Sequence, residues 1–335
     1  MTHIAAIKEG IYTVNKNWHL LVVQLVTFVL GGLSFFIIVG MPIAIAFILF
    51  GLDLTEILSL RDLVSVFRGS AELLDKYFAM ALIILFSLLI YLSFVLVVWI
   101  YALAGTIAIL ARSILKEIDE FNLKIFFSEG RRLFFSLAMF SSVIGILFLA
   151  IAFFLGILVG GASSIIDIAK SCDATLGLFI SFFCSLVLIS TGITLLLPAL
   201  SLAAYGAAHL AFYRSQFFTA IKEAARYLYS KPSAIGLYTV LLLGYIVIGF
   251  IVIMIGAPLT FIPLIGPLIA LPYQLVSYII QGYISLVMMA SIFHYYKNTI
   301  SAAPPGLSTE AGDISQNIVV EPPPLPDQTE ETQAG

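Results

Sequence analysis

Five long stretches of this sequence contain no Asp, Glu, Lys or Arg at all. They are Leu20–Leu52, Tyr77–Ala111, Leu133–Ile166, Ala174–Tyr213 and Pro232–Tyr296. Helices on the surface of a water-soluble domain need a charged outer face, and these stretches cannot provide one. About 20 apolar residues cross a bilayer as a helix, so the first four stretches predict one crossing each and the longer fifth predicts two. The sequence therefore predicts an all-α, polytopic membrane protein with about six transmembrane helices.

The composition excludes several classes of protein. Apolar residues make up 61% of the chain and charged residues 10%, with a net charge of −3. No basic surface for nucleic acid is present, so we expect no nucleic-acid partner. The two cysteines, Cys172 and Cys184, are expected to be free thiols, because a helix would hold them too far apart for a disulfide.

The basic residues are divided unevenly between the two sides of the six predicted spans. Twelve of the 16 Lys and Arg fall in the N-terminal segment, the second and fourth loops and the segment after the last span. The other loops share the remaining four. Because cytoplasmic loops are enriched in Lys and Arg, this pattern predicts that both termini are cytoplasmic. That arrangement requires an even number of spans, and six satisfies it.

A unit occurs three times along the chain. Each copy opens with a short amphipathic segment containing a glutamate, continues through two apolar stretches and ends at a basic residue. The glutamates are Glu9, Glu129 and Glu223, and the closing basic residues are Arg112, Arg214 and Lys297. We predict three parallel hairpin repeats, each led by an amphipathic helix at the membrane interface; chance similarity of basic, aromatic loops is the alternative.

These features resemble a known group of proteins. The I-K-E-G segment at Ile7–Gly10, the N-K-N-W segment at Asn15–Trp18 and the F-I-P-L-I-G-P-L turn at Phe261–Leu268 are similar to uncharacterised bacterial six-span proteins. These include the membrane domain attached to some glycerophosphodiester phosphodiesterases. The resemblance covers roughly residues 1–300 and implies a location in the bacterial plasma (inner) membrane. The catalytic domain of those enzymes has no counterpart here, so their activity does not carry over.

The predicted transmembrane domain spans residues 1–298, with units at about 1–112, 113–214 and 215–298. Residues 299–335 are acidic, rich in proline and without aromatic residues, which predicts a disordered cytoplasmic tail. The tail could solubilise the protein or dock a protein partner. The four prolines of Gly256–Pro272 exclude a single regular helix there, and this segment either lies at the outer surface or re-enters the membrane.

Candidate site residues fall into two groups, both without catalytic chemistry. Cations of the amphipathic segments are candidates for lipid headgroups: Lys8, Lys16, Arg131, Arg132, Lys222 and Arg226. The second group comprises polar residues within spans: Gln274, Tyr278 and Gln281 are candidates for interhelical hydrogen bonds or a polar path, and His209 and His294 lie near the ends of their spans. For the two histidines we favour anchoring at the headgroup level over a proton relay or metal pair. We expect Gly156 and Gly160, a G-x-x-x-G match, to allow close helix packing.

No catalytic, cofactor-binding or metal-binding pattern is visible, so the sequence favours a protein that is not an enzyme. The leading hypothesis is a protein that binds membrane lipids, or scaffolds a membrane complex, through its amphipathic segments. A protein partner would then meet these segments or the tail. The alternative is a transporter or channel for an apolar or lipid-like substrate, with a groove near the sixth span.

Overall fold

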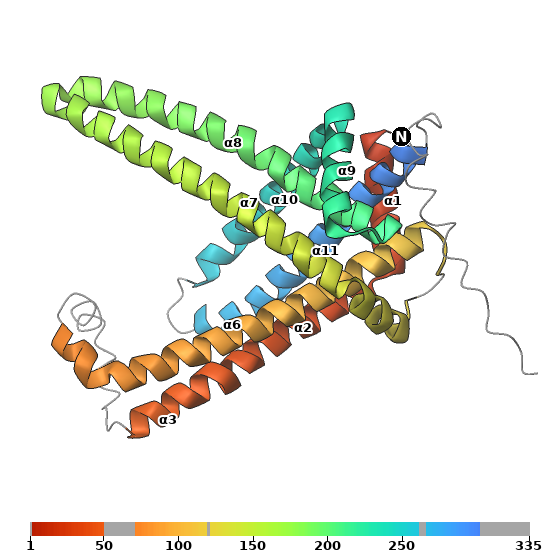
Figure 1. Ribbon diagram of the computed structural model, residues 1–335, viewed down its shortest axis with the longest axis horizontal. Coiled ribbons are helices and arrows are strands. Elements are labelled where there is room, and N and C mark those ends of the chain that lie inside the picture. The colour runs from red at the N-terminus through yellow and green to blue at the C-terminus, as the bar shows by residue number, and fades with distance from the viewer. Residues whose placement is uncertain (1, 50–70, 119–120, 261–265, 302–335) are drawn as a thin grey trace, which may run out of the picture. The chain divides into compact units, whose positions relative to one another are not determined.

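The computed structural model describes residues 2–49, 71–118, 121–260 and 266–301, and these ranges are helical with no strand among them (Figure 1). Six helical segments are long and apolar enough to cross a membrane. They are His19–Ala46, Ala81–Ile114, Leu123–Cys172, Ala174–Tyr213, Ser233–Gly256 and Pro272–Ile300. The predicted all-α, six-span membrane fold is therefore confirmed. The tail from residue 302 onward lies outside the described residues.

The chain divides into two units, Met1–Tyr296 and Lys297–Gly335, and the contacts reported below lie within the first. Its helices, in chain order, are α1 (His3–Lys16), α2 (His19–Phe35), α3 (Met41–Leu49), α6 (Ala71–Ile114), α7 (Leu123–Cys172), α8 (Ala174–Tyr213), α9 (Phe217–Ser230), α10 (Ser233–Thr260) and α11 (Gly266–Ser301, which continues into the second unit).

A π-helical turn at Phe36–Gly40 joins α2 to α3. Pro42 explains its position, because proline has no N–H to donate and its ring excludes the carbonyl of the residue four positions earlier. A wider turn relieves that conflict without ending the helix. The first span is therefore one nearly continuous rod that is longer than a single crossing needs.

The helices α7 and α8 form a hairpin with a one-residue connection (Figure 1). Asp173 ends α7 and caps α8, where its Oδ1 accepts a hydrogen bond of 2.7 Å from the backbone N–H of Thr175. Its extended backbone, with φ −157° and ψ 132°, reverses the chain. The neighbouring Cys172 is exposed at this tip, and both cysteines are free thiols, as expected.

The three leading segments, which are α1, the first turns of α7 and α9, bury equivalent positions. In each, the small residue directly after the glutamate of the repeat is buried, as are the residues four positions before and three positions after that small residue. The buried sets are Ala6, Gly10 and Thr13; Phe126, Gly130 and Leu133; and Ala220, Ala224 and Tyr227. This shared spacing places one stripe of each helix against the protein.

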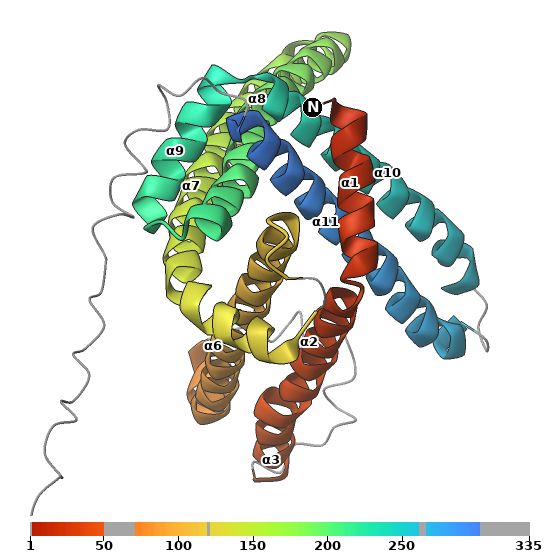
Figure 2. The same ribbon diagram turned by 90° about the vertical axis from the view of Figure 1, so that its right-hand side faces the viewer.

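The small residue of each leading segment lies against a second span of another unit. Gly10 of α1 faces Ser291 of α11. A Cβ built on Gly130 of α7 would lie 3.5 Å from the Cα of Gly105 in α6. Ala224 of α9 lies beside Gly206 of α8. Each leading segment thus packs on the second span of the preceding unit, and that of the first unit packs on the third (Figure 2). The three repeats close into a ring.

The expected close packing at Gly156 and Gly160 is wrong within this chain. No atom lies within 4 Å of a Cβ built on either residue, and both are exposed on α7. The G-x-x-x-G spacing places them on one helix face, but that face meets no other helix in the described part of the chain. Close approaches occur instead at Gly10 and Gly105, where leading segments cross spans, and at Gly206, which faces the ring of Phe140 in α7.

Candidate anion-binding site

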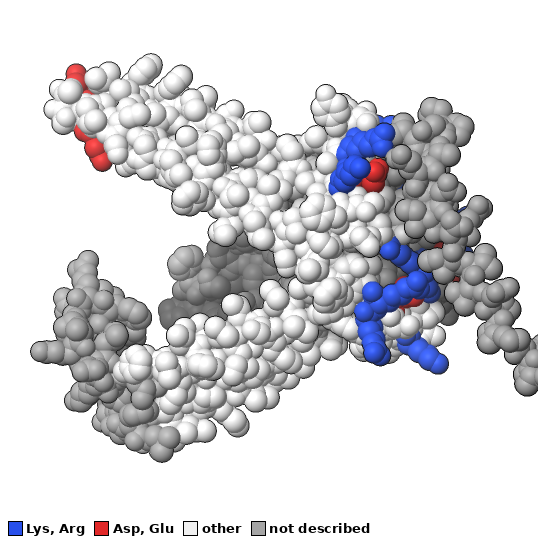
Figure 3. Space-filling model, viewed as in Figure 1, with Lys and Arg blue, Asp and Glu red and all other residues white. Residues whose placement is uncertain are grey.

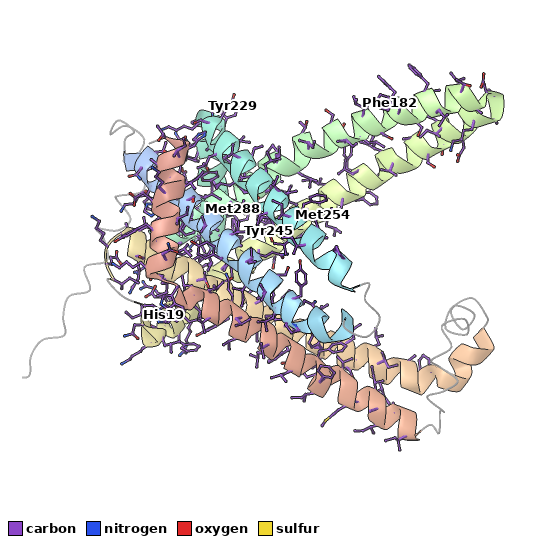
Figure 4. All side chains as sticks on the ribbon, turned by 180° about the vertical axis from the view of Figure 1, so that it is seen from behind. His19, Phe182, Tyr229, Tyr245, Met254 and Met288 are labelled. Atoms are coloured by element: carbon purple, nitrogen blue, oxygen red, sulfur yellow. The ribbon has the colours of Figure 1, made fainter. Side chains whose placement is uncertain are left out.

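All six cations predicted to meet lipid headgroups are exposed on the leading segments. They are Lys8, Lys16, Arg131, Arg132, Lys222 and Arg226. They project from helices whose opposite stripe is buried, so the sequence places small or apolar residues inward and cations outward. Tyr12 and Tyr229 are exposed beside them, and Figure 4 labels Tyr229 on α9. Tyr227 of α9 is instead buried against Tyr205 and Tyr296.

The three leading segments lie at the same end of the spans. Asn17, just after α1, donates a 2.9 Å hydrogen bond from Nδ2 to Ser113 Oγ in the last turn of α6. Glu129 in α7 contacts Arg112 in that same turn. Tyr205 in α8 donates to the carbonyl of Ala234, three residues after Lys231. On the face that Figure 3 shows, the Lys and Arg side chains gather at this end, whereas Lys170 lies in the last turn of α7 near the tip of the α7–α8 hairpin.

A basic pocket lies where α6, α7 and α8 meet at this end. Its volume is about 110 Å³. Three arginines and one glutamate supply its charge, and small or apolar residues complete it. The lining residues are Ala108, Arg112, Glu129, Arg132, Leu133, Ser136, Ala211 and Arg214. We call these eight residues the basic pocket.

Glu129 is shared by two of the arginines. Its Oε1 accepts a hydrogen bond of 2.8 Å from Arg112 Nη2, and its Oε2 lies 3.6 Å from Arg214 Nη2. The Glu129 side chain is only 12% exposed, whereas those of Arg112 and Arg214 are 24% and 41% exposed. The glutamate therefore ties the end of α6 and the end of α8 to the start of α7.

The backbone of Arg214 is left-handed, with a φ of 51° and a ψ of 31°. Such a conformation is uncommon for a residue with a Cβ and costs about 1 kcal/mol or more. At this position it ends α8, and the backbone N–H of Arg214 donates to the carbonyl of Leu210 at 3.0 Å. The turn holds the guanidinium beside Glu129 instead of letting the helix carry it away.

Positive charge exceeds negative charge in the basic pocket. Arg112, Arg132 and Arg214 face the single carboxylate of Glu129, and Arg132 makes no ion pair within the described part of the chain. The buried Nε of Arg112 has no hydrogen-bond acceptor. The nearest further carboxylate, the half-exposed Glu117, lies 3.7 Å from this Nε, so one positive charge remains even when Glu117 is included.

Each of the two span histidines joins two helices, whereas we had expected anchoring at the headgroup level. His209 is buried, and its Nδ1 lies 2.8 Å from the hydroxyl of Tyr296 in α11. The Nε2 of His294 lies 2.8 Å from the hydroxyl of Thr13 in α1. Both bonds connect segments that are far apart in sequence, which explains why these histidines can lie near the ends of apolar helices.

The predicted polar stripe on α11 is divided between different partners. Tyr278 stacks on Phe28 at 4.2 Å between ring centroids and donates to the carbonyl of Gln24, so it joins α2 to α11. Gln281 instead donates to Ser277 Oγ within α11 at 3.3 Å. Gln274 is exposed. Only the middle residue of the stripe therefore has an interhelical hydrogen bond among those in the described residues.

An apolar groove lies on α8, and its volume is about 440 Å³. One face of that helix lines it, including Phe182, which is labelled in Figure 4. This groove is on the fourth span and not near the sixth, where the transporter hypothesis had placed one. Across the described ranges, no three His, Cys, Asp or Glu side chains come together as ligands for a metal ion.

No protein-family model, curated protein or solved structure matches this chain. The residues of the basic pocket were only partly identified from the sequence. Arg132 was a headgroup candidate, but Arg112, Glu129 and Arg214 entered only as markers of the repeat. Their recurrence at unit boundaries was the available signal, because in a ring of repeats the boundary residues of neighbouring units meet.

Proposed function

We propose that this protein is not an enzyme and that it binds anionic membrane lipids through its leading segments. The observation that supports the proposal is that all six predicted cations are exposed at one end of the spans, on helices whose other face is buried. Each Lys or Arg at an anionic surface contributes about 1 kcal/mol of attraction. The leading segments thus present a cationic, aromatic rim at the level of the headgroups.

The proposal includes scaffolding of a membrane complex by the same rim or by the tail. It also includes the resemblance of this chain to the membrane domain of glycerophosphodiester phosphodiesterases.

Transport of an apolar or lipid-like substrate is the second candidate function. The apolar groove on α8 favours it, because Ser185, Ser190 and Thr194 add hydroxyls to an otherwise apolar wall. Most transporters driven by ions use buried carboxylates or histidines, and the histidines here join helices instead.

Orientation forms part of the proposal: the cationic rim faces the cytoplasm of a bacterial cell, and the α7–α8 tip faces outward. Cys172 tests this, because it is exposed at that tip and is one of two cysteines. In intact cells expressing a Cys184→Ser variant, we expect a membrane-impermeant maleimide to label Cys172. Labelling that occurs only after the membrane is permeabilised would show the opposite orientation. Cys172→Ser in the same background serves as the negative control.

The lipid proposal is tested by native mass spectrometry of the full-length protein, extracted gently with its bound lipids. We expect anionic lipids to be enriched over their share of the membrane. Replacing Lys8, Lys16, Arg131, Lys222 and Arg226 by glutamine is expected to reduce the retained anionic lipid about tenfold or more, because five attractive charges are lost. The basic pocket keeps its own charges in this variant.

The matched control exchanges Lys for Arg and Arg for Lys at the same five positions, which preserves the charge. We expect it to retain anionic lipid like the unmodified protein. Enrichment that survives in the glutamine variant would refute a role for the rim. A stable partner protein without selective lipid would favour a scaffold, and finding neither would direct the work to flux assays.

A further inference from the structure

We propose that the basic pocket binds a phosphate group, supplied either by the headgroup of an anionic lipid or by a free phosphate ion. The lipid source rests on the proposed function, whereas the free ion does not. The pocket shares Arg132 with the rim but differs from it, because its residues come from three helices and surround one partly open volume.

The donors fit phosphate chemistry. Guanidinium groups offer planar pairs of N–H donors that match phosphate oxygens, and such charged hydrogen bonds are among the strongest in proteins. Glu129 occupies one side of Arg112 and approaches Arg214, which leaves other N–H groups of both available to a ligand. Arg132, without an ion pair in the described residues, adds a third guanidinium, and Ser136 adds a hydroxyl.

The size and depth of the pocket also suit a headgroup. A water molecule occupies about 30 Å³ of liquid volume, so 110 Å³ holds a few waters or one phosphate group but not an acyl chain. Arg112 and Arg214 lie where the apolar stretches of α6 and α8 end, which is the level of lipid headgroups. Basic pockets between transmembrane helices on the cytoplasmic side are a known setting for lipid phosphates.

Stabilisation of the C-terminal ends of helices explains the positions of two of the three arginines but does not explain the pocket. A cation at a helix C-terminus is stabilised by the carbonyl dipoles, and Arg112 and Arg214 occupy such ends. Arg132 does not, because it lies in the third turn of α7, near the N-terminal end of that helix. The helix dipole acts mainly on the first and last turns, so it does not account for Arg132, and Glu129 is already shared by the other two arginines.

The experiment compares Arg132→Gln with Lys124→Gln in the full-length protein. Both remove one exposed cation from the start of α7, but Lys124 does not line the basic pocket. In a neutral detergent, which has no anionic surface, the protein is titrated with phosphatidylglycerol and separately with inorganic phosphate, using sulfate as the competing anion. Binding is followed by native mass spectrometry and by the melting temperature.

We expect Arg132→Gln to weaken binding about tenfold, as loss of one charged hydrogen-bonding group implies, and Lys124→Gln to change it less than twofold. Arg132→Lys should restore part of the affinity, because it keeps the charge but not the planar pair of donors. Binding of phosphatidylglycerol alone identifies a lipid, and equal binding of inorganic phosphate identifies the free ion. A shift with phosphate but not with sulfate excludes a general salt effect.

Equal effects of the two glutamine variants, or no binding of either ligand, would refute the proposal that the basic pocket binds phosphate. These outcomes can be distinguished from those of the experiment that tests lipid binding by the rim. Loss of all anionic lipid in the five-residue variant, together with no difference between Arg132→Gln and Lys124→Gln, refutes the pocket and keeps the rim. The reverse pattern, one lipid retained by the five-residue variant and lost by Arg132→Gln, supports the pocket.

Discussion

Replacing Gly10 by alanine is expected to destabilise the protein by about 1–3 kcal/mol. A Cβ at this position would lie 2.2 Å from Ser291 Oγ, 2.9 Å from the Ser291 backbone nitrogen and 3.0 Å from its Cα. The Ser291 hydroxyl can rotate away, but the backbone of α11 cannot, so α1 has to move outward. That movement also weakens the nearby hydrogen bond between Thr13 and His294. Unfolding in mixed micelles with increasing SDS measures the change.

Gly156→Ala is the matched control, because no atom lies within 4 Å of a Cβ built there. Alanine favours the helix over glycine by about 0.8–1 kcal/mol, so this variant should be as stable as the unmodified protein or more so. Gly105→Ala provides a second test at the next contact of the ring, where a Cβ would lie 2.4 Å from the Phe126 ring. Equal stability of the Gly10 and Gly156 variants would contradict the packing of α1 on α11.

The membrane class and the six spans could be predicted because they depend on single segments. A stretch such as Ala174–Tyr213, without charge, has one stable environment, whichever helices surround it. The surface helices followed from the same local logic, since Lys222 and Arg226 alternate with the buried Ala220 and Ala224 at helical spacing.

The contacts between segments could not be predicted in the same way. Gly156 and Gly160 show a packing motif but contact no other helix among the residues that the structure describes, whereas Gly10 and Gly105 show no such motif and lie at close crossings. Lipid tails are as apolar as leucine, so hydropathy does not distinguish a lipid-facing surface from a helix-facing one. The hydrogen bond of His209 was not predicted either, because its partner Tyr296 is far away in sequence.

The repeat was the sequence feature that contained some of this missing information. Glu129 opens the second unit, and it meets Arg112, which closes the first, and Arg214, which closes the second. A residue at a unit boundary therefore indicates a site at a junction. Treating Glu129 only as a marker of the repeat overlooked what its side chain touches.

Replacing Glu129 by glutamine is expected to lower the free energy of unfolding by about 2 kcal/mol while raising the affinity of the basic pocket for phosphate. The carboxylate is 12% exposed and holds Arg112 at 2.8 Å. Removing one partner of a buried ion pair costs about 3–5 kcal/mol, and the partial exposure of Arg112 and Arg214 reduces that cost through solvent screening. The three arginines then lose their only carboxylate within the pocket, so repulsion among them grows.

The same loss makes the pocket more attractive to an anion. A unit charge a few ångströms away contributes about 1 kcal/mol or more in water, so phosphate should bind about fivefold more tightly to Glu129→Gln. Added phosphate should then recover part of the lost stability, because a ligand of the folded state stabilises it. A double-mutant cycle with Arg112→Gln isolates the pair: if Arg112 and Glu129 interact as the 2.8 Å contact indicates, the double variant loses less stability than the two single losses added together. Additive losses, or phosphate binding that weakens in Glu129→Gln, would show that the carboxylate neither joins the three helices nor limits the charge of the pocket.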